Sequence, residues 1–396
     1  MFEQLTTLSP DPLLGLIKRF AQDPRPEKID LGVGVYRDDS GQTPVLAAVK
    51  AAESQLLQSE SSKSYVGPAG NLEFCSAMAE LLFGRDLSAK LQARVASLQT
   101  PGGCGALRVL GETIVRANQK ARLWASDPTW ANHLPLLGSA GLQINNYRYY
   151  DFAGHGLDFD GMMSDLQQAQ AGDVLLLHAC CHNPSGADLN QQQWQQVIEL
   201  CQQQNLVPLI DVAYLGFGDG LDEDAYGLRL AVERLPEVLI AVSCSKNFGL
   251  YRERVGAAFV ISENAASAQA CFSHMASITR AMYSMPPSHG ASVVAAILDD
   301  ETLAQQWLSE LTQMRERIQS LRSQLRQSLA DELGHDRFAF IEAEKGMFSF
   351  LGLDADQVQR LAEDFGIYMA DSSRINLAGL NSGNLAHLVS SLKLML

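Results

Sequence analysis

One stretch of this sequence carries most of its chemical information: Ser243-Cys244-Ser245-Lys246-Asn247-Phe248-Gly249-Leu250-Tyr251-Arg252-Glu253-Arg254-Val255-Gly256. It follows directly on the apolar run Val238 to Val242, which is typical of a buried strand. Two hydroxyl groups, a lysine and an arginine then come together in a segment that contains glycine. The stretch therefore predicts a strand that ends in a polar loop.

A lysine at a strand end, among groups that bind phosphate, suits a Schiff base with a phosphorylated aldehyde cofactor, pyridoxal 5′-phosphate (PLP). An ordinary solvated loop would have the same composition, so the stretch alone does not choose between the two. The remaining parts of the sequence favour the cofactor.

The composition is that of an acidic globular chain. Its 396 residues are enough for one large domain and a smaller one, and its net charge of −15 argues against nucleic acid and anionic membranes as partners. No apolar run approaches the length of a membrane span, and Met1 to Leu5 lacks the features of a signal peptide. Seven cysteines without CxxC spacing indicate free thiols in a reducing compartment. We therefore expect a cytoplasmic protein.

Apolar runs alternate with amphipathic patterns over most of the chain. The expected strands are Arg94–Leu98, Arg122–Ala125, Gln143–Tyr147, Val174–Ala179, Leu206–Ile210, Leu239–Cys244 and Ala257–Ile261. The expected helices are Ala106–Asn118, Asn132–Gly138, Gly161–Gln170, Gln191–Gln204 and Asp224–Glu233. This alternation predicts an α/β fold with a mostly parallel central sheet and helices on both faces, where ligands bind beyond the carboxyl ends of the strands.

After Pro286-Pro287 the pattern changes to a long helix, Glu301 to Leu329, then short strands near Phe348 and Ile375 and a last helix near Asn384–Leu394. We expect this tail and the start of the chain to form a smaller α+β domain. The predicted division is an N-terminal arm at residues 1–12, a small domain at residues 13–45 and 310–396, and a large domain at residues 46–309.

Polar residues follow two of the expected strands. Asp211 could neutralise a cofactor cation and Tyr214 could hydrogen-bond a phenolate oxygen, although a strand-end carboxylate often only caps the next turn. In His178-Ala179-Cys180-Cys181-His182-Asn183-Pro184-Ser185-Gly186, the adjacent thiols and the donor spacing argue against zinc. The pair Asn183-Pro184 more simply turns the chain and aims the Asn183 amide into the site.

Three further segments are weaker candidates. The Gly-rich stretch Thr100 to Leu107 opens a helix and could seat an anion on its backbone N–H groups. Trp130, close to His133 at the start of another helix, either stacks on a planar ring or belongs to the core. Gly32-Val33-Gly34 is most simply a turn.

Two arginines, Arg280 and Arg374, stand among apolar and small residues. A buried arginine needs an anionic partner, so each is either a carboxylate clamp or half of an internal ion pair. The sequence alone slightly favours the ion pair.

Together these motifs resemble the class I aminotransferases of fold type I, and among them the bacterial aspartate and aromatic amino acid aminotransferase group. The resemblance runs from Asp11-Pro12-Leu13-Leu14-Gly15-Leu16 to the C-terminal helix. Its most specific motifs are the Lys246 stretch and His178 to Gly186; Asp211 to Phe217 and Tyr283 to Ala291 add to them. The resemblance implies PLP as the cofactor and a homodimer as the active form.

The resemblance also implies roles around the cofactor ring. Lys246 would form the Schiff base and then move the proton of the substrate Cα. Asp211 would pair with the pyridinium nitrogen, with His133 supporting it from behind and His178 lying further out. The remaining ring contacts would come from Tyr214 and Asn183 at the ring oxygen and from Trp130 against the ring. The phosphate would be held by Gly103, Cys104, Ser243, Ser245, Arg254 and, from the neighbouring subunit, Tyr65.

For the substrate, the resemblance implies two carboxylate clamps. Arg374 would bind the α-carboxylate, assisted by Asn183 and the Gly34 amide, with Trp130 beside them. Arg280 would come from the partner subunit and bind the side-chain carboxylate of aspartate, glutamate or their keto acids. In the aromatic-accepting branch, the resemblance implies that this arginine swings aside, so its presence does not exclude tyrosine or phenylalanine.

Some positions depart from the family pattern. Cys104 stands where Thr or Ser usually donates to the phosphate, which puts the tightness of cofactor binding in doubt. Val35 and Thr43 resemble the aspartate branch, Asp224-Ala225-Tyr226 resembles the aromatic branch, and Met285 matches neither. We expect ping-pong transamination between aspartate, with tyrosine and phenylalanine as further substrates, and 2-oxoglutarate. Aromatic amino acids as the main substrates are the alternative.

Two other classes of protein are less consistent with the sequence. A β-lyase or decarboxylase on the same fold would not need both Arg280 and Arg374. A non-catalytic regulatory protein would be expected to lack Lys246 or Asp211, or to carry a DNA-binding domain, for which the chain leaves no room.

Overall fold

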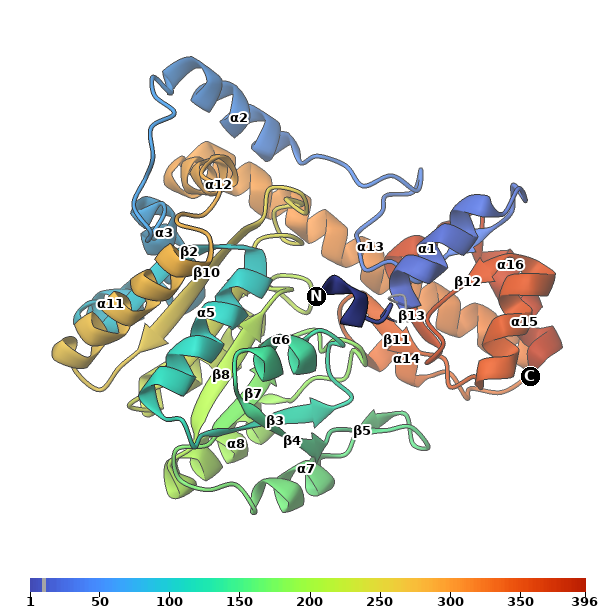
Figure 1. Cartoon of the computed structure of the whole chain (residues 1–396). Helices are drawn as coiled ribbons and strands as arrows, with labels where there is room; N and C mark the ends of the chain where they lie inside the picture. Colours follow the sequence, from blue (N-terminus) through green and yellow to red (C-terminus); the bar gives the residue numbers. More distant parts are fainter. Residues whose placement is uncertain (9–11) are drawn as a thin grey trace.

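The computed structural model describes residues 1–8 and 12–396, and its centre is a seven-stranded sheet (Figure 1). The strands, in the order in which they lie side by side, are β2 (Val95–Pro101), β10 (Val255–Ile261), β9 (Val238–Ser243), β8 (Val207–Val212), β7 (Val174–His178), β3 (Arg122–Asp127) and β4 (Gln143–Arg148). Strand β10 runs antiparallel to both of its neighbours, and the other neighbouring pairs are parallel. The predicted mostly parallel sheet is confirmed.

Alternate residues of the strands face two hydrophobic cores, one on each side of the sheet. In β9, Leu239 and Ala241 belong to one core, and Ile240 and Val242 belong to the other, as the two-residue period of a strand requires. The first core includes residues of α5 (Gly102–Ala117), α6 (His133–Ser139) and α11 (Ala265–Met282). The second includes residues of α3 (Leu72–Phe83), α7 (Phe159–Leu166), α8 (Gln191–Gln204), α10 (Tyr226–Arg234) and α12 (His289–Asp299). Helices on both faces are therefore confirmed.

Several smaller elements surround this layered body. They are α2 (Ala47–Ser59), α4 (Arg85–Leu91), the 3₁₀ helix η2 (Gln92–Arg94), α9 (Leu221–Asp224) and the short strand pair β5 (Tyr150–Asp151) and β6 (Gly156–Leu157). The helix expected over Asp224–Glu233 is interrupted at Ala225, between α9 and α10.

A second group of elements lies at the far end of the long helix α13 (Glu301–Leu333) (Figure 1). Its strands are β1 (Ile29–Asp30) parallel to β12 (Ile367–Tyr368), and β11 (Phe348–Phe350) antiparallel to β13 (Arg374–Asn376). Its helices are α1 (Pro12–Gln22), α14 (Phe340–Ala343), α15 (Ala355–Phe365) and α16 (Leu385–Met395), and the 3₁₀ helix η3 (Leu377–Gly379) joins them. The start and the end of the chain thus meet here.

The predicted domain boundaries stay a prediction. The one between residues 309 and 310 falls within α13, which continues unbroken from Glu301 to Leu333. In the predicted N-terminal arm, the 3₁₀ helix η1 (Phe2–Gln4) is exposed, and residues 9–11, including Asp11 of the N-terminal motif, lie outside the described residues.

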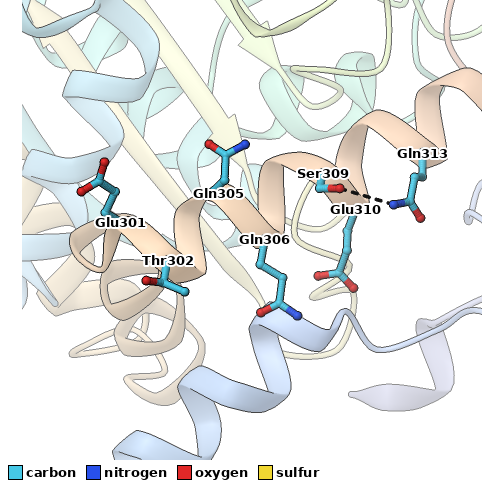
Figure 2. A pocket seen from close by; sticks show the side chains of 7 residues that line it. All are labelled: Glu301, Thr302, Gln305, Gln306, Ser309, Glu310 and Gln313. Atoms are coloured by element: carbon cyan, nitrogen blue, oxygen red, sulfur yellow. Dashed lines mark hydrogen bonds between the residues drawn. The ribbon is translucent and has the colours of Figure 1, made fainter.

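The outer face of α13 carries an open groove, lined by the polar side chains drawn in Figure 2. Among them, Glu310 accepts hydrogen bonds from the backbone N–H groups of Ala47 (2.6 Å) and Ala48 (3.0 Å) at the start of α2. The residue before α2, Leu46, has no capping side chain. Glu310 therefore supplies the cap of α2 from a helix more than 250 residues later in the chain.

Candidate active site

A cleft of about 330 Å³ lies at the carboxyl ends of the parallel strands. The segments that follow β7, β8 and β9 border it, together with the first turn of α5, the segment Val33–Val35 and β13. The predicted site residues that line it are Gly34, Gly103, Cys104, Trp130, His178, Asn183, Asp211, Tyr214, Ser243, Ser245, Lys246, Arg254 and Arg374. Residues from widely separated parts of the sequence therefore share one cavity.

The antiparallel direction of β10 explains how one loop supplies both a lysine and an arginine. Lys246 follows the end of β9, whereas Arg254 precedes the start of β10, so both lie at the same edge of the sheet. The Gly249 N–H donates to the Lys246 carbonyl (3.0 Å), and Gly249 has a φ of +66°, which glycine adopts without strain. This tight turn brings the chain back toward β10.

The environment of Lys246 favours its uncharged form. Its Nζ lies 5.0 Å from the centroid of the Tyr214 ring. Burial lowers the pKa of Lys246, the Asp211 carboxylate opposes this effect, and the Arg254 charge adds to it. A lysine with a lowered pKa is a better nucleophile and base near neutral pH. Burial raises the pKa of Tyr214, so its phenol keeps the proton that it can donate.

A chain of hydrogen bonds leads from Asp211 into the protein. Nε2 of His133 lies 2.9 Å from Oδ2 of Asp211. Oγ1 of Thr129 lies 2.8 Å from Nδ1 of His133 and 3.3 Å from Nε2 of His178. The Asn183 backbone N–H donates to Nδ1 of His178 (3.5 Å), so each following group in the chain donates toward Asp211. The chain ends with the His133 N–H donating to the carboxylate.

This arrangement keeps Asp211 ionised although it is buried. Burial by itself raises the pKa of Asp211, but the hydrogen bond from His133 opposes this effect, and the pKa lies below its usual value. Burial lowers the pKa of His178 to about 3, so this imidazole is neutral at physiological pH. A buried carboxylate that faces the cleft is suited to a cationic partner such as a pyridinium nitrogen.

The first turn of α5 borders one end of the cleft, where it could bind an anion. No side chain of the described residues caps this 16-residue helix, so its first N–H groups are available to an anion. Arg254 donates to Oγ of Ser245 (3.4 Å), and the Ser245 N–H donates to Oγ of Ser243 (3.3 Å). Gly102 has a φ of +71°, and a Cβ there would lie 2.5 Å from Nη2 of Arg254. Gly102–Gly105, expected as a loop, is the first helical turn.

Arg374 borders the opposite side of the cleft. It donates to the carbonyl of Gly32 (2.8 Å) and to Oδ1 of Asn183 (3.5 Å), and its Cζ lies 4.5 Å from the centroid of the Phe348 ring. Its Nε is buried without a hydrogen-bond partner in the part of the chain that is described. No carboxylate of the described residues forms an ion pair with Arg374, so the prediction that Arg374 is half of an internal ion pair is wrong.

The structure does not bring two predicted site residues into this cleft. Arg280, at the end of α11, is exposed and hydrogen-bonds Ser284, and Tyr65 is 95% exposed. No carboxylate of the described residues pairs with Arg280, so the prediction of an internal ion pair is wrong for this residue as well. Both side chains point to a surface of the single chain.

Sequence analysis missed three residues around the cleft. Thr129 links the two histidines, Phe348 underlies Arg374, and Tyr251 lines the cleft, where its hydroxyl accepts from the Tyr36 N–H (2.9 Å). Tyr251 stood in the opening motif, and its place three residues before Arg254 was a usable signal. The other two had no signal of their own.

One buried cluster, Cys180, Cys181 and Asp224, has the ligand types of a metal site. The carboxylate oxygens of Asp224 already accept hydrogen bonds from the backbone N–H groups of Gly216, Gly218 and Asp219. Burial also raises the pKa of the Cys181 thiol to about 11, which disfavours the thiolate that a metal requires. The Asp224 carboxylate therefore already has hydrogen-bond partners from the turn, and the cluster is explained without a metal ion.

This fold and this cleft define a PLP-dependent enzyme of fold type I. Lys246, with its lowered pKa, matches the aldehyde of the cofactor. The buried, ionised Asp211 matches the ring nitrogen. The uncapped start of α5 beside Arg254 matches the phosphate. Residues 26–392 match the family described as aminotransferase class I and II, and the chain belongs to this family.

Named relatives agree with this assignment. The chain is 46% identical over 392 residues to the aspartate aminotransferase of Salmonella typhi, which covers 99% of both chains. It is 47% identical over 385 residues to the aromatic-amino-acid aminotransferase of Paracoccus denitrificans, which covers 97% of both. A crystal structure of the aromatic-amino-acid aminotransferase from Burkholderia pseudomallei, covalently bound to pyridoxal phosphate, matches the fold with a TM-score of 0.97 and 39% identity, covering 100% of this chain and 99% of that one. The chain is thus an aminotransferase that uses PLP.

None of the described helices is both long and apolar enough to cross a membrane.

Proposed function

We propose that this enzyme transfers the amino group of L-aspartate, and also that of tyrosine and phenylalanine, to 2-oxoglutarate by a ping-pong mechanism. The observation that carries the proposal is the state of Arg374. Its guanidinium borders the cleft, its Nε has no partner among the described residues, and its only acceptors among those residues are a neutral amide and a carbonyl. A substrate α-carboxylate would supply the anion that this site lacks.

The other cleft residues would divide the chemistry among them. PLP, when bound, supplies an electron sink for the negative charge that develops at the substrate Cα. Asp211 would keep the ring nitrogen protonated, and Lys246 would hold the cofactor at rest and then take and return the Cα proton. Tyr214 and Asn183 would hydrogen-bond the ring oxygen, and Trp130 would lie against the ring. The phosphate would be held by Gly103, Cys104, Ser243, Ser245 and Arg254.

We also propose that the active form is a homodimer. Tyr65 and Arg280 are exposed and lie outside the cleft of their own chain, which supports a role in the cleft of the partner. The first residues of the chain expose apolar side chains that a partner could cover: Met1, Phe2, Leu5 and Leu8. In such a dimer Arg280 would bind the distal carboxylate of aspartate. The acidic charge and the free cysteines support a cytoplasmic location.

A second candidate is an aromatic amino acid aminotransferase with aspartate as a lesser substrate. Relatives with either name match the chain at nearly the same identity, 46% and 47%. The exposed Arg280 is not held by an acid in the described part of the chain, which would allow it to move aside for a ring.

The test is kcat/KM for aspartate and for phenylalanine, each with 2-oxoglutarate, on the unaltered enzyme. A strong preference for aspartate would support a fixed distal clamp. Comparable values, or a preference for phenylalanine, would favour the second candidate. Absence of transfer from both amino acids would contradict the proposal. Initial rates at several 2-oxoglutarate concentrations should give parallel double-reciprocal lines if the mechanism is ping-pong.

A further inference from the structure

We infer that Arg322 is a positioning residue for the substrate-carboxylate site and that it acts through Phe348. Arg322 lies on α13, is only 2% exposed, and does not line the cleft. A buried arginine must have its donors satisfied, and the identity of its acceptors shows what it holds in place. This inference rests on the proposed function, in which Arg374 binds the substrate α-carboxylate.

The guanidinium of Arg322 binds peptide carbonyls of one short segment. Its acceptors are the carbonyl oxygens of Ile341 (2.7 Å), Lys345 (3.1 Å), Gly346 (2.8 Å) and Phe348 (2.6 Å) and Oγ of Ser349 (2.8 Å). The carboxylate of Glu344 is further away, at 3.7 Å, and it also accepts from Tyr150 and Ser349. The main contacts of Arg322 are therefore with the backbone of this turn, and its ion pair with Glu344 is secondary. A lysine, with donors at a single point, could not reach so many carbonyls.

Phe348 connects this turn to the cleft. Its ring lies under the Arg374 guanidinium, 4.5 Å from Cζ, and its centroid is 6.0 Å from that of Tyr214. A Cβ added at Gly34 would lie 2.9 Å from Cζ of Phe348. The ring thus contacts three positions of the candidate site at once. Because Arg322 fixes the Phe348 carbonyl, it fixes the surface on which Arg374 rests.

The same turn packs against the loop that carries Asn183. The Lys345 N–H donates to the Gly186 carbonyl (2.8 Å), and a Cβ at Gly186 would lie 2.5 Å from the Phe348 carbonyl oxygen. Asn183 stands three residues before Gly186 and accepts from Arg374. The turn held by Arg322 therefore supports both side chains that contact the Arg374 guanidinium.

The experiment uses the PLP-loaded enzyme and succinate, a dicarboxylate that cannot react, as the probe. Arg322→Lys should raise the Kd of succinate about tenfold, because small displacements of a clamp cost large factors in binding. KM for aspartate should rise by a similar factor, while kcat at saturation changes less than about threefold. The matched control is Arg326→Lys, one turn further along α13, where the arginine pairs with Asp336 at the surface; its Kd should stay within about twofold of the unaltered value. A lower Tm of Arg322→Lys with an unchanged Kd would overturn the inference.

Two further variants keep the test decisive if Arg322→Lys does not fold. Ser349→Ala removes one acceptor of the guanidinium and should raise the Kd of succinate about threefold; an unchanged Kd would overturn the inference. Phe348→Leu should raise the Kd and should make Ser349→Ala nearly silent when the two are combined, whereas additive effects would show that the turn does not act through Phe348. If the unaltered enzyme binds no succinate and transfers no amino group, the proposed function has failed instead.

Discussion

Nε2 of His133 lies 2.9 Å from Oδ2 of Asp211, and both side chains are buried at the carboxyl end of β8. This pair sets the charge at the base of the cleft. The hydrogen bond keeps Asp211 as a carboxylate in surroundings that would otherwise favour its neutral form, because its pKa is lowered in spite of burial.

Asp211→Asn should therefore be severe. The amide cannot neutralise a cation on the cofactor ring, so we expect kcat/KM to fall about 1000-fold or more, roughly 4 kcal/mol in the activation free energy. Asp173→Asn is the matched control, since Asp173 is also buried and paired, with Arg122, but precedes β7 at the opposite edge of the sheet. Steady-state kinetics of both variants check this. Similar losses of kcat/KM in the two would contradict the assigned role of Asp211.

Lys246→Met should stabilise the cofactor-free protein in a pH-dependent way. Burial lowers the pKa of Lys246 from its ordinary 10.5, so the protonated lysine destabilises the folded state at pH values below the lowered pKa. The gain in the free energy of unfolding should be about 1 kcal/mol near neutral pH and should disappear as the pH rises to 10.5 and above. Urea unfolding at several pH values measures it. Lys393→Met, at a half-exposed position, is the control and should give no such gain; a pH-independent gain for Lys246→Met would argue against a buried ammonium.

Arg280→Leu should change specificity more than overall activity. In the proposed dimer this arginine binds only the distal carboxylate, so kcat/KM for aspartate should fall about 100-fold or more while that for phenylalanine changes less than about tenfold. Arg116→Leu, on the exposed part of α5 where Arg116 contacts Ser277, serves as the control and should affect neither substrate. Equal losses for both substrates in Arg280→Leu would show that this residue is misplaced in our proposal.

Glu310→Ala should lower stability without affecting the chemistry. The variant removes the cap that Glu310 provides to the N–H groups of Ala47 and Ala48, a loss of about 1 kcal/mol. For a chain of this size that corresponds to a fall in Tm of about 1–2 °C. Calorimetry at a fixed protein concentration checks it, with Glu316→Ala, at an exposed position of the same helix, as the control. A Tm equal to that of the control would contradict the capping role.

The site residues that follow strands were the most predictable from sequence. Asp211 directly follows one apolar run, and Lys246 stands four residues after the end of another, at Val242; because strand ends of a parallel sheet meet at one edge, their proximity follows from the pattern. Thr129 could not be found in this way, because its role depends on two histidines that are far apart in the chain. Phe348 was placed on a strand, but its contact with Arg374 comes from the pairing of β11 with β13.

Helices without a clear apolar stripe were also beyond the sequence analysis. In α11 the described buried residues, which include Ala268, Met275 and Ile278, are interspersed with small and polar residues, so its pattern is weak. Tertiary packing against β2 and α5, and not local sequence, accounts for its position.

The pairing of Ile29 with Ile367 has a consequence for the order in which the protein is completed during synthesis. Ile29, which lies just before the segment that borders the cleft at Gly34, leaves the ribosome more than 300 residues before its strand partner Ile367. At roughly 5–20 residues per second, the wait is on the order of tens of seconds. All seven strands of the sheet beside Lys246 are synthesised before β11 and β13, so the part of the cleft wall that contains Arg374 is added to the chain after the sheet strands are complete.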